Sequence, residues 1–229
     1  MLSIYVGYDP VESIAYHTLA HSIQRRSSVP VSIAPVARQQ LKGIYTRERG
    51  PTESTDFSLT RFLVPWMSGF AGWSLYMDCD MLCRGDVAEL AAATTRNPDK
   101  ALLVCKHDYV PSTSRKFLDR VQTTYPKKNW SSLMLFNNER CRALTPDYVN
   151  SASPAQLHRF EWLQDPSIGA LPLEWNWLVG EYPHNPGAKI AHFTLGGPYF
   201  DEFRSCDYAE EWFAESESMR HVASAPRKR

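Results

Sequence analysis

The sequence has no excess of charge, no long apolar run and few cysteines, and each of these absences excludes a class of protein. Its 229 residues contain 25 lysines and arginines against 25 acidic residues. This balance provides no field that would attract nucleic acid or an anionic membrane, so we expect neither partner. No apolar stretch approaches the roughly 20 residues that a transmembrane helix requires, so we expect no membrane-spanning segment.

Cysteine usage and the first residues bear on the cellular compartment. The five cysteines are odd in number and irregularly spaced, which does not suit a disulfide framework. Residues 1–9 lack the basic and apolar regions of a signal peptide. We therefore expect a reduced, cytoplasmic location. Cys79, Cys83, Cys105 and His107 also suggest a zinc site, but structural zinc sites use more closely spaced cysteine pairs. We interpret these cysteines as buried free thiols.

Two periodicities of apolar residues alternate along the chain. Runs typical of buried strands occupy residues 3–8, 31–36, 73–77, 101–105 and 132–136. Helical spacing marks residues 11–23, 59–66, where Pro65 ends or kinks the helix, and about 208–219. Strands that alternate with helices predict an α/β fold with a mostly parallel central sheet flanked by helices. We find no repeat or linker, and we predict one domain over residues 1–229 with a flexible tail from about residue 220.

Two carboxylates stand at the end of the strongest predicted strand, in the segment Asp78-Cys79-Asp80. Ligands of open α/β sheets bind at the carboxyl ends of the strands, which is where these side chains fall. Carboxylate oxygens suit Mg²⁺ or Mn²⁺, and such a cation neutralises the diphosphate of a nucleotide sugar. The same pattern also fits a solvated turn after a strand, so its interpretation depends on the rest of the chain.

Motifs on both sides of this segment identify a family. Residues 60–65, 74–82 and 85–90 read Thr-Arg-Phe-Leu-Val-Pro, Ser-Leu-Tyr-Met-Asp-Cys-Asp-Met-Leu and Gly-Asp-Val-Ala-Glu-Leu. Further motifs follow at residues 131–137, 162–165, 173–176 and 190–198. In this order and over about residues 3–200, the chain resembles the family 8 glycosyltransferases, relatives of glycogenin and of bacterial lipopolysaccharide galactosyltransferases. The resemblance implies the GT-A fold of nucleotide-diphospho-sugar transferases.

The resemblance also implies an activity. A family 8 enzyme moves a hexosyl group from a nucleotide sugar, here expected to be a UDP sugar, and retains the anomeric configuration. The acceptor is left open as a saccharide, a lipid-linked molecule or a protein. Asp78, Asp80 and His192 are the implied metal ligands, and an imidazole ligand suits Mn²⁺ better than Mg²⁺.

Further residues take roles from the resemblance. The implied donor-binding residues are Tyr8, Asp9, Arg61, Asp78, Gly196 and Gly197. Asp9 would meet the uracil or cap the following helix, and the two glycines would let backbone amides approach the diphosphate. Asp165, next to Gln164, is the implied catalytic carboxylate that stabilises an oxocarbenium-like sugar. Asp165 also fits a turn, because Asp-Pro readily starts one.

Departures from the family leave an alternative open. Gly197-Pro198-Tyr199 replaces the Lys-Pro-Trp of the family, and Trp130-Ser131-Ser132 replaces its Asn-Ala-Gly. A catalytically weak or inactive relative that binds nucleotide sugars is therefore the alternative. A nucleotidyltransferase is disfavoured because no Gly-rich phosphate loop follows the first strand. One aromatic set suits either sugar stacking or a core: Trp162, Trp175, Trp177, Tyr182, Tyr199 and Phe200.

Overall fold

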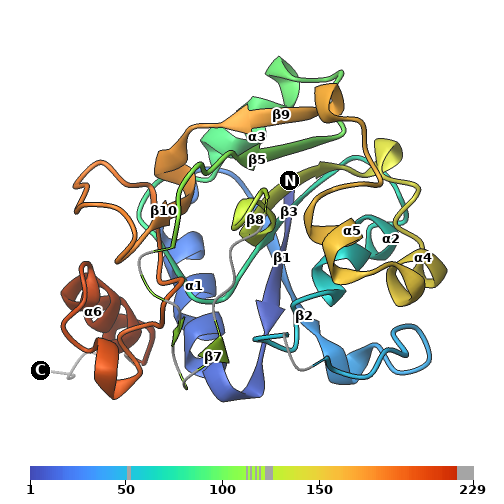
Figure 1. The fold of residues 1–229 in the computed structure, drawn as a ribbon. Coiled ribbons are helices and arrows are strands. Elements are labelled where there is room, and N and C mark those ends of the chain that lie inside the picture. Colours follow the sequence, from blue (N-terminus) through green and yellow to red (C-terminus); the bar gives the residue numbers. More distant parts are fainter. Residues whose placement is uncertain are drawn as a thin grey trace, which may run out of the picture.

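The computed structural model describes residues 1–50, 53–111, 113, 115, 116, 118, 120, 121 and 126–220 of the chain. Its strands (Figure 1) are β1 (Leu2–Tyr8), β2 (Val31–Ala37), β3 (Trp73–Met77), β4 (Met81–Cys83), β5 (Leu102–Cys105), β6 (Arg115–Lys116), β7 (Arg120–Val121), β8 (Leu133–Asn137), β9 (Ile168–Leu171), β10 (Trp177–Leu178) and β11 (Ile190–His192). Its α-helices are α1 (Ser13–Arg26), α2 (Val64–Met67), α3 (Ala88–Arg96), α4 (Pro146–Ser151), α5 (Pro154–His158) and α6 (Ala209–Arg220). Each predicted strand is present within a few residues of its predicted bounds.

The central sheet has the strand order β2-β1-β3-β8-β5-β9. β1 runs parallel to β2 and β3, and β5 runs parallel to β9, whereas β8 is antiparallel to both of its neighbours. The predicted α/β fold with a mostly parallel sheet is confirmed, with β8 as the exception. All five residues of β8 are buried, as in a parallel strand covered on both faces. The apolar run of β8 therefore does not reveal whether the strand is parallel or antiparallel to its neighbours.

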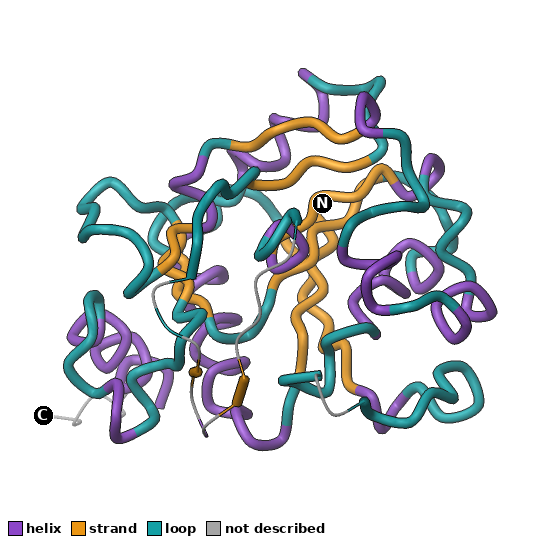
Figure 2. Tube along the Cα trace, viewed as in Figure 1, coloured by secondary structure: helices purple, strands orange, loops and turns teal. Residues whose placement is uncertain are grey.

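A second, small sheet lies beside the central one in the order β10-β11-β4 (Figure 2). β4 begins directly after Asp80, and β11 pairs with it antiparallel, so that His192 stands opposite Met81. The backbone N–H of Phe193 donates to the carbonyl of Asp80 at 2.8 Å. This pairing therefore joins the end of β3 to a segment that is distant in the sequence.

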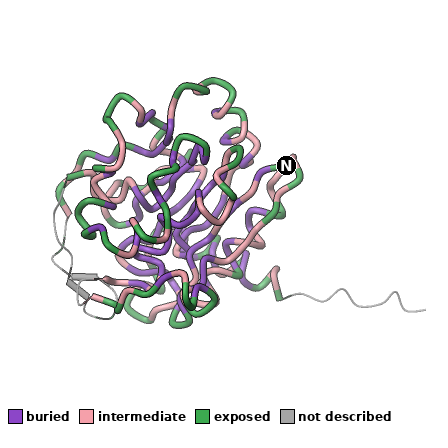
Figure 3. The backbone as a smooth tube through the Cα atoms, turned by 90° about the vertical axis from the view of Figure 1, so that its right-hand side faces the viewer, coloured by how far each residue is buried: buried purple, intermediate pink, exposed green. Residues whose placement is uncertain are grey.

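The helices are distributed around the central sheet. In Figure 1, α2, α4 and α5 lie together on one side, α1 and α6 lie on the other, and α3 is at the top with β5 and β9. Figure 3 shows buried segments in the interior and exposed ones at the periphery. Ala15, Leu19 and Ile23 of α1 are fully buried in the core. Val11, which helical spacing predicts on the same face, is 54% exposed, because the 3₁₀ turn Pro10–Glu12 precedes the helix and has a different period.

The predicted helix over residues 59–66 is wrong in detail. The structure has a 3₁₀ turn at Thr60–Leu63 that leads into the short helix α2. Pro65 stands in the first turn of α2 rather than at a kink or an end, a position where its missing N–H costs nothing. The side chains of the turn are buried, including Arg61. The turn thereby carries a charged group into the core near the end of β3.

The predicted flexible tail from about residue 220 lies, apart from Arg220 at the end of α6, outside the described residues. Across the described ranges, no helix is long and apolar enough to cross a membrane.

One buried carboxylate holds α6 to α1. Glu215 is 2% exposed, and its oxygens lie 2.6 Å from His21 Nδ1 and 2.8 Å from Arg26 Nη1, with Arg25 Nη1 at 3.4 Å. Burial alone would raise the pKa of Glu215, but the hydrogen bond and charge of Arg26, with His21 and Arg25, hold it below its ordinary value of 4.5. The charged form of Glu215 is thus the one that stabilises this contact.

We expect Glu215→Gln to lower the free energy of unfolding at pH 7 by about 1–2 kcal/mol, because its cationic partners are partly exposed and screened. Since the folded pKa is depressed, this stabilisation is present above pH 4.5 and is lost as the pH falls through the folded value. Urea unfolding at pH 7 and at pH 3 measures both. Glu217→Gln, on the exposed face of α6, is the control. An equal loss for both variants would contradict the assignment.

Candidate metal and donor site

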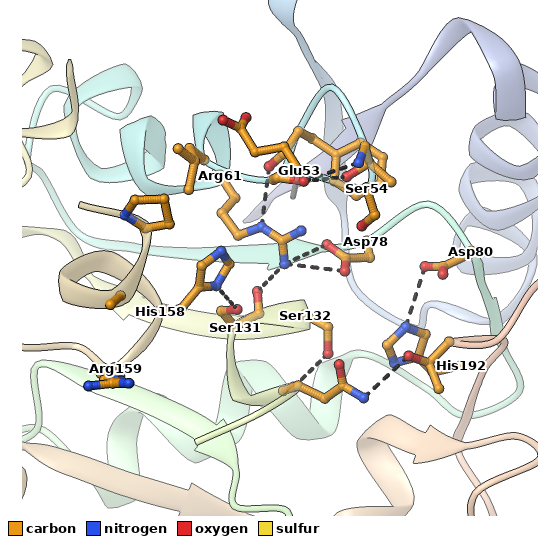
Figure 4. A pocket seen from close by; sticks show the side chains of 18 residues that line it. Glu53, Ser54, Arg61, Asp78, Asp80, Ser131, Ser132, His158, Arg159 and His192 are labelled. Atoms are coloured by element: carbon orange, nitrogen blue, oxygen red, sulfur yellow. Dashed lines mark hydrogen bonds and ion pairs between the residues drawn. The ribbon is translucent and has the colours of Figure 1, made fainter. Parts of the chain in front are cut away.

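Three potential ligands meet where β3 ends. Asp78 and Asp80 flank Cys79 between β3 and β4, and His192 is the last residue of β11. One ligand atom from each lies within 4.8 Å of the others. His192 Nε2 faces Asp80 Oδ1 at 3.4 Å (Figure 4). The three predicted metal ligands are therefore brought together by the fold.

Asp78 is held by two neighbours. Tyr76 donates its hydroxyl to Asp78 Oδ1 at 2.8 Å, and Arg61 Nη1 lies 3.0 Å from the same oxygen. Burial raises the pKa of Asp78, while the Arg61 guanidinium acts against that shift. Arg61 also donates to the carbonyls of Phe57 at 3.2 Å and Ser131 at 2.8 Å. In this structure, Arg61 therefore fixes Asp78 in place as a buried ion pair.

His192 is held from its other side by Asn176. The ring is 2% exposed, and its Nδ1 lies 2.8 Å from Asn176 Oδ1. A carbonyl-type partner on one ring nitrogen is the usual second contact of a metal-binding histidine, because it orients the ring. Asn176 lies in the Trp-Asn pair that belongs to the family resemblance, but the sequence offered no sign of this contact.

A cavity of about 280 Å³ opens beside the three ligands, which is near the lower end of the roughly 300–1,000 Å³ of small-molecule sites. In Figure 4, Asp80 and His192 lie at one side of it, with His158 and Arg159 at the other. Its lining is mostly polar and comprises Glu53, Ser54, Thr55, Phe57, Ser58, Leu59, Arg61, Asp78, Asp80, Asn129, Ser131, Ser132, Pro154, Ala155, His158, Arg159, His192 and Thr194.

His158 is a cavity residue that the sequence analysis missed. Its Nδ1 lies 2.8 Å from Ser131 Oγ. Burial, followed by the charge of Arg61, lowers the pKa of His158 to about 3. The imidazole is therefore neutral at pH 7 and offers hydrogen bonds rather than charge. No motif marked it, because α5 enters the site only through tertiary packing.

The donor set fits a divalent cation such as Mn²⁺. Metal–ligand bonds of about 2.0–2.6 Å allow one ion to bridge atoms as far apart as these. Two carboxylates and one imidazole combine oxygen and nitrogen donors, as Mn²⁺ and similar ions accept. Within the described part of the chain, no other trio of acidic, histidine or cysteine groups is arranged to share an ion. The described residues Cys79, Cys83, Cys105 and His107 therefore do not form the zinc site that was considered as an alternative.

The cysteines behave as buried thiols. Cys79, Cys83 and Cys105 are all free and buried. Burial raises the pKa of the Cys83 thiol to about 12 and that of the Cys79 thiol well above its ordinary value. Such thiols stay protonated at neutral pH and are inert.

Asp9, which is predicted to contact uracil, caps a turn in this structure. Asp9 accepts from the backbone N–H of Val11 at 3.0 Å through one oxygen and from that of Asp56 at 3.0 Å through the other. Asp9 and Tyr8 are both absent from the cavity lining. The capping role considered in the sequence analysis is thus present, and the uracil contact stays a prediction.

The two glycines after β11 have other uses here. The N–H of Gly196 donates to the carbonyl of Phe193 at 2.9 Å and closes a turn. A Cβ at Gly197 would overlap the ring of Tyr199. That ring is half-buried, and its hydroxyl donates to Glu12 Oε2 at 2.5 Å. Gly197 therefore makes room for Tyr199, and amide contacts to a diphosphate stay predictions.

Gln164 and Asp165 do not line the cavity. Asp165 begins the 3₁₀ turn Asp165–Ser167, and its side chain is 79% exposed. The ammonium of Lys127 lies 2.6 Å from it and, through a hydrogen bond, lowers the pKa of Asp165. The turn role is present, and this geometry lends no support to the predicted catalytic role.

The aromatic set offered as a sugar-stacking surface is not in the cavity either. None of its six members appears among the lining residues. Trp175 is buried in the main core, and Trp177 and Tyr199 pack against a second apolar cluster around Trp212. Packing in or against the apolar core accounts for Trp175, Trp177 and Tyr199.

The fold is that of GT-A glycosyltransferases. The chain superposes on the bifunctional glycosyltransferase WbbM with a TM-score of 0.68 at 12% identity, covering 94% of this chain and 49% of that one. It also superposes on an active-site mutant of LgtC with a TM-score of 0.61 at 13% identity, covering 97% and 98%. The chain thus spans about half the length of WbbM and nearly all of LgtC. At such identities the likeness shows the GT-A fold, as predicted, and leaves family 8 membership a prediction.

No family model matches the chain. Protein CDI of Arabidopsis thaliana is 45% identical over 224 residues, which cover 93% of this chain and 85% of the relative. The chain belongs to the same family as Protein CDI.

We expect Mn²⁺ to raise the melting temperature, because a cation relieves the repulsion between Asp78 and Asp80 and binds only the folded chain. A 100-fold excess over Kd adds about 2.7 kcal/mol, a shift of several degrees for a protein of this size. Thermal unfolding with and without Mn²⁺ measures it. Asp80→Asn should abolish the shift, whereas Asp201→Asn, which removes an exposed carboxylate, should keep it. A full shift in Asp80→Asn would refute the metal assignment.

We expect Asp165→Asn to leave turnover unchanged, because its carboxylate is exposed, paired with Lys127 and outside the cavity. Steady-state kinetics and a donor-binding titration on the same preparation provide the test. A fall in turnover of about tenfold, or about 1.4 kcal/mol of barrier, with unchanged donor affinity would restore the catalytic role instead.

Proposed function

We propose that this protein is a metal-dependent glycosyltransferase that moves a hexosyl group from a UDP sugar to a saccharide, lipid-linked or protein acceptor and retains the anomeric configuration. The observation that carries the proposal is the meeting of Asp78, Asp80 and His192 at the carboxyl end of a central strand. In α/β sheets this edge is where ligands bind. LgtC, which shares the fold, has been solved with donor and acceptor sugar analogs, so the fold accommodates both substrates at once.

The roles of the chain's own residues follow from the geometry. Asp80 and His192 would hold the cation, with Asp78 as the third ligand. When bound, Mn²⁺ supplies positive charge that stabilises the leaving diphosphate. Arg61 and Tyr76 keep the Asp78 carboxylate from turning away, because each binds Oδ1 from within the core. The ligand set is therefore arranged before any substrate arrives, which lowers the reorganisation needed during reaction.

The cavity next to the ligands is the proposed site of the transferred hexosyl group. Asn129, Ser131 and Thr194 contribute polar groups to its wall, as hydroxyl-rich sugars require. Arg61 and Arg159 contribute cationic side chains. Asp9 is the proposed determinant of base choice, since a carboxylate oxygen with one backbone donor can accept a second hydrogen bond from the imide N–H of uracil. Gly196 and Gly197 are proposed to approach the diphosphate.

A second candidate is a relative that binds nucleotide sugars without transferring them. The lysine position of the family is Gly197 in this chain, and the nearby Tyr199 turns inward to Glu12. This segment therefore presents no cation to a diphosphate. A binder would share the metal site and the donor affinity, so only turnover separates the two candidates.

We expect purified protein with Mn²⁺ to bind UDP more tightly than CDP and to hydrolyse a UDP-hexose slowly without acceptor, because water can replace the acceptor. Calorimetry measures the two affinities, and release of UDP measures the hydrolysis. His192→Ala should lose both the UDP binding and the hydrolysis. Tight UDP binding without any UDP release from a panel of UDP-hexoses would favour the non-catalytic binder, and equal affinity for CDP would refute the role of Asp9.

The stereochemistry of the sugar product is an independent test. We expect an α-linked UDP-hexose to yield an α-configured sugar, read by proton NMR early in the reaction before mutarotation. A β-configured product would exclude the proposed retaining class while leaving the metal site intact.

A further inference from the structure

Asn176 is a fully buried amide whose polar atoms all have partners. It ends the 3₁₀ turn Leu173–Asn176, immediately before β10. Its Oδ1 lies 2.8 Å from His192 Nδ1, and its Nδ2 donates to Ser132 Oγ at 2.8 Å and to the carbonyl of Asn129 at 3.3 Å. A buried amide this well satisfied has one orientation, because any loss of a partner leaves a desolvated polar atom.

The orientation follows from the chemistry of these partners. The carbonyl of Asn129 can only accept, so the amide nitrogen of Asn176 must face it. Ser132 donates its hydroxyl hydrogen to that same carbonyl at 2.7 Å, which leaves a lone pair of Ser132 Oγ for Asn176. A rotated amide would set its oxygen against two acceptors. The oxygen of Asn176 therefore points to His192.

The proton position on His192 is set in turn. Asn176 Oδ1 accepts, so His192 Nδ1 carries the hydrogen, and a neutral ring then has its lone pair on Nε2. Nε2 faces Asp80 Oδ1 at 3.4 Å. Two atoms with lone pairs thus oppose each other, and these are the atoms that would hold a cation when one is bound.

We propose that Asn176 is a positioning residue that holds His192 as the Nδ1–H tautomer and presents Nε2 to the cation. The proposal deepens the metal-dependent function proposed above and rests on it for the identity of the cation. Ser132 assists by fixing the amide. It lies in the segment that departs from the Asn-Ala-Gly of the family, so this hydroxyl is a feature of the present chain.

Asn129 connects this arrangement to the wall of the cavity. Its backbone has a φ of 60°, a left-handed conformation that asparagine tolerates better than most residues. Its side chain donates to Tyr109 Oη at 2.6 Å and lies 3.2 Å from Thr194 Oγ1. The carbonyl that orients Asn176 is thereby held by contacts on two separate loops.

The tautomer can be read directly in the metal-free protein. Two-bond ¹⁵N–¹H correlation NMR of histidine-labelled protein distinguishes the Nδ1–H from the Nε2–H form, and His192→Ala assigns the signal. We expect the Nδ1–H pattern in the parent and a mixture of both tautomers in Asn176→Leu. A parent His192 in the Nε2–H form would overturn the proposal without any reference to metal binding or activity.

Metal affinity is the second readout, with Mn²⁺ alone as the probe. We expect Asn176→Leu to weaken Mn²⁺ binding about 10–100-fold, the usual effect of losing such a contact. Asn176→Asp keeps an oxygen toward His192 but sets its other oxygen against the carbonyl of Asn129, so it should lose less affinity than Asn176→Leu without matching the parent. Ser132→Ala should also cause a smaller loss than Asn176→Leu. Asn150→Leu is the control, because it removes a half-buried amide bonded to Thr46 and Ile44 that lies away from the cavity.

The outcomes separate this inference from the proposed function. Parent-like Mn²⁺ affinity in folded Asn176→Leu would overturn the positioning role even if the enzyme transfers sugar. A parent that binds no Mn²⁺ would remove the proposed function, and the NMR experiment would still decide the tautomer. If Asn176→Leu does not fold, Ser132→Ala provides the test. A parent-like His192 tautomer and parent-like Mn²⁺ affinity in Ser132→Ala would show that the hydroxyl does not fix the amide. That result would overturn the argument that orients Asn176.

Discussion

The antiparallel pairing of β11 with β4 is the contact on which the candidate site depends. β4 directly follows the Asp-Cys-Asp segment, and the pairing sets His192 opposite Met81. The hydrogen bond from Phe193 to the Asp80 carbonyl continues it past the strand end. Side chains alternate between the faces of a strand, so a slip of one residue would turn His192 away from the carboxylates. The register of a three-residue strand thereby decides whether a third ligand exists.

Near this contact, the buried carboxylate of Asp78 is matched by a buried cation. Arg61 enters the core on a 3₁₀ turn and meets Asp78, and its Nε and Nη1 also donate to the backbone carbonyls of Phe57 and Ser131. A buried ion pair of this kind is weak evidence for stability, because desolvation offsets much of the attraction. Its value here is geometric, since it prevents the carboxylate from rotating. Asn176 has the same effect on His192 without any charge.

Local sequence offered competing uses for some residues. Asp165 has the chemistry of a catalytic carboxylate and the chemistry of a turn, and in this structure it begins a 3₁₀ turn and pairs with Lys127. Gly197 suggested close approach of a phosphate, yet the side chain that needs its missing Cβ is Tyr199. β8 carries the apolar pattern of a parallel strand and runs antiparallel, because burial on both faces produces that pattern in either direction.

The sequence by itself determined the strands, the α/β class and the Asp78–Asp80 pair at a strand end, because apolar periodicity and chain punctuation are local properties. It also indicated His192 as a third ligand, because His192 lies in a motif of the family resemblance; the sequence did not show that His192 lies near the two carboxylates. Tertiary structure alone decided that Arg61 pairs with Asp78, that His158 enters the cavity and that Asn176 orients His192. Each of these is a contact between segments that are separate in the chain, and its geometry depends on packing and register, which local patterns do not encode.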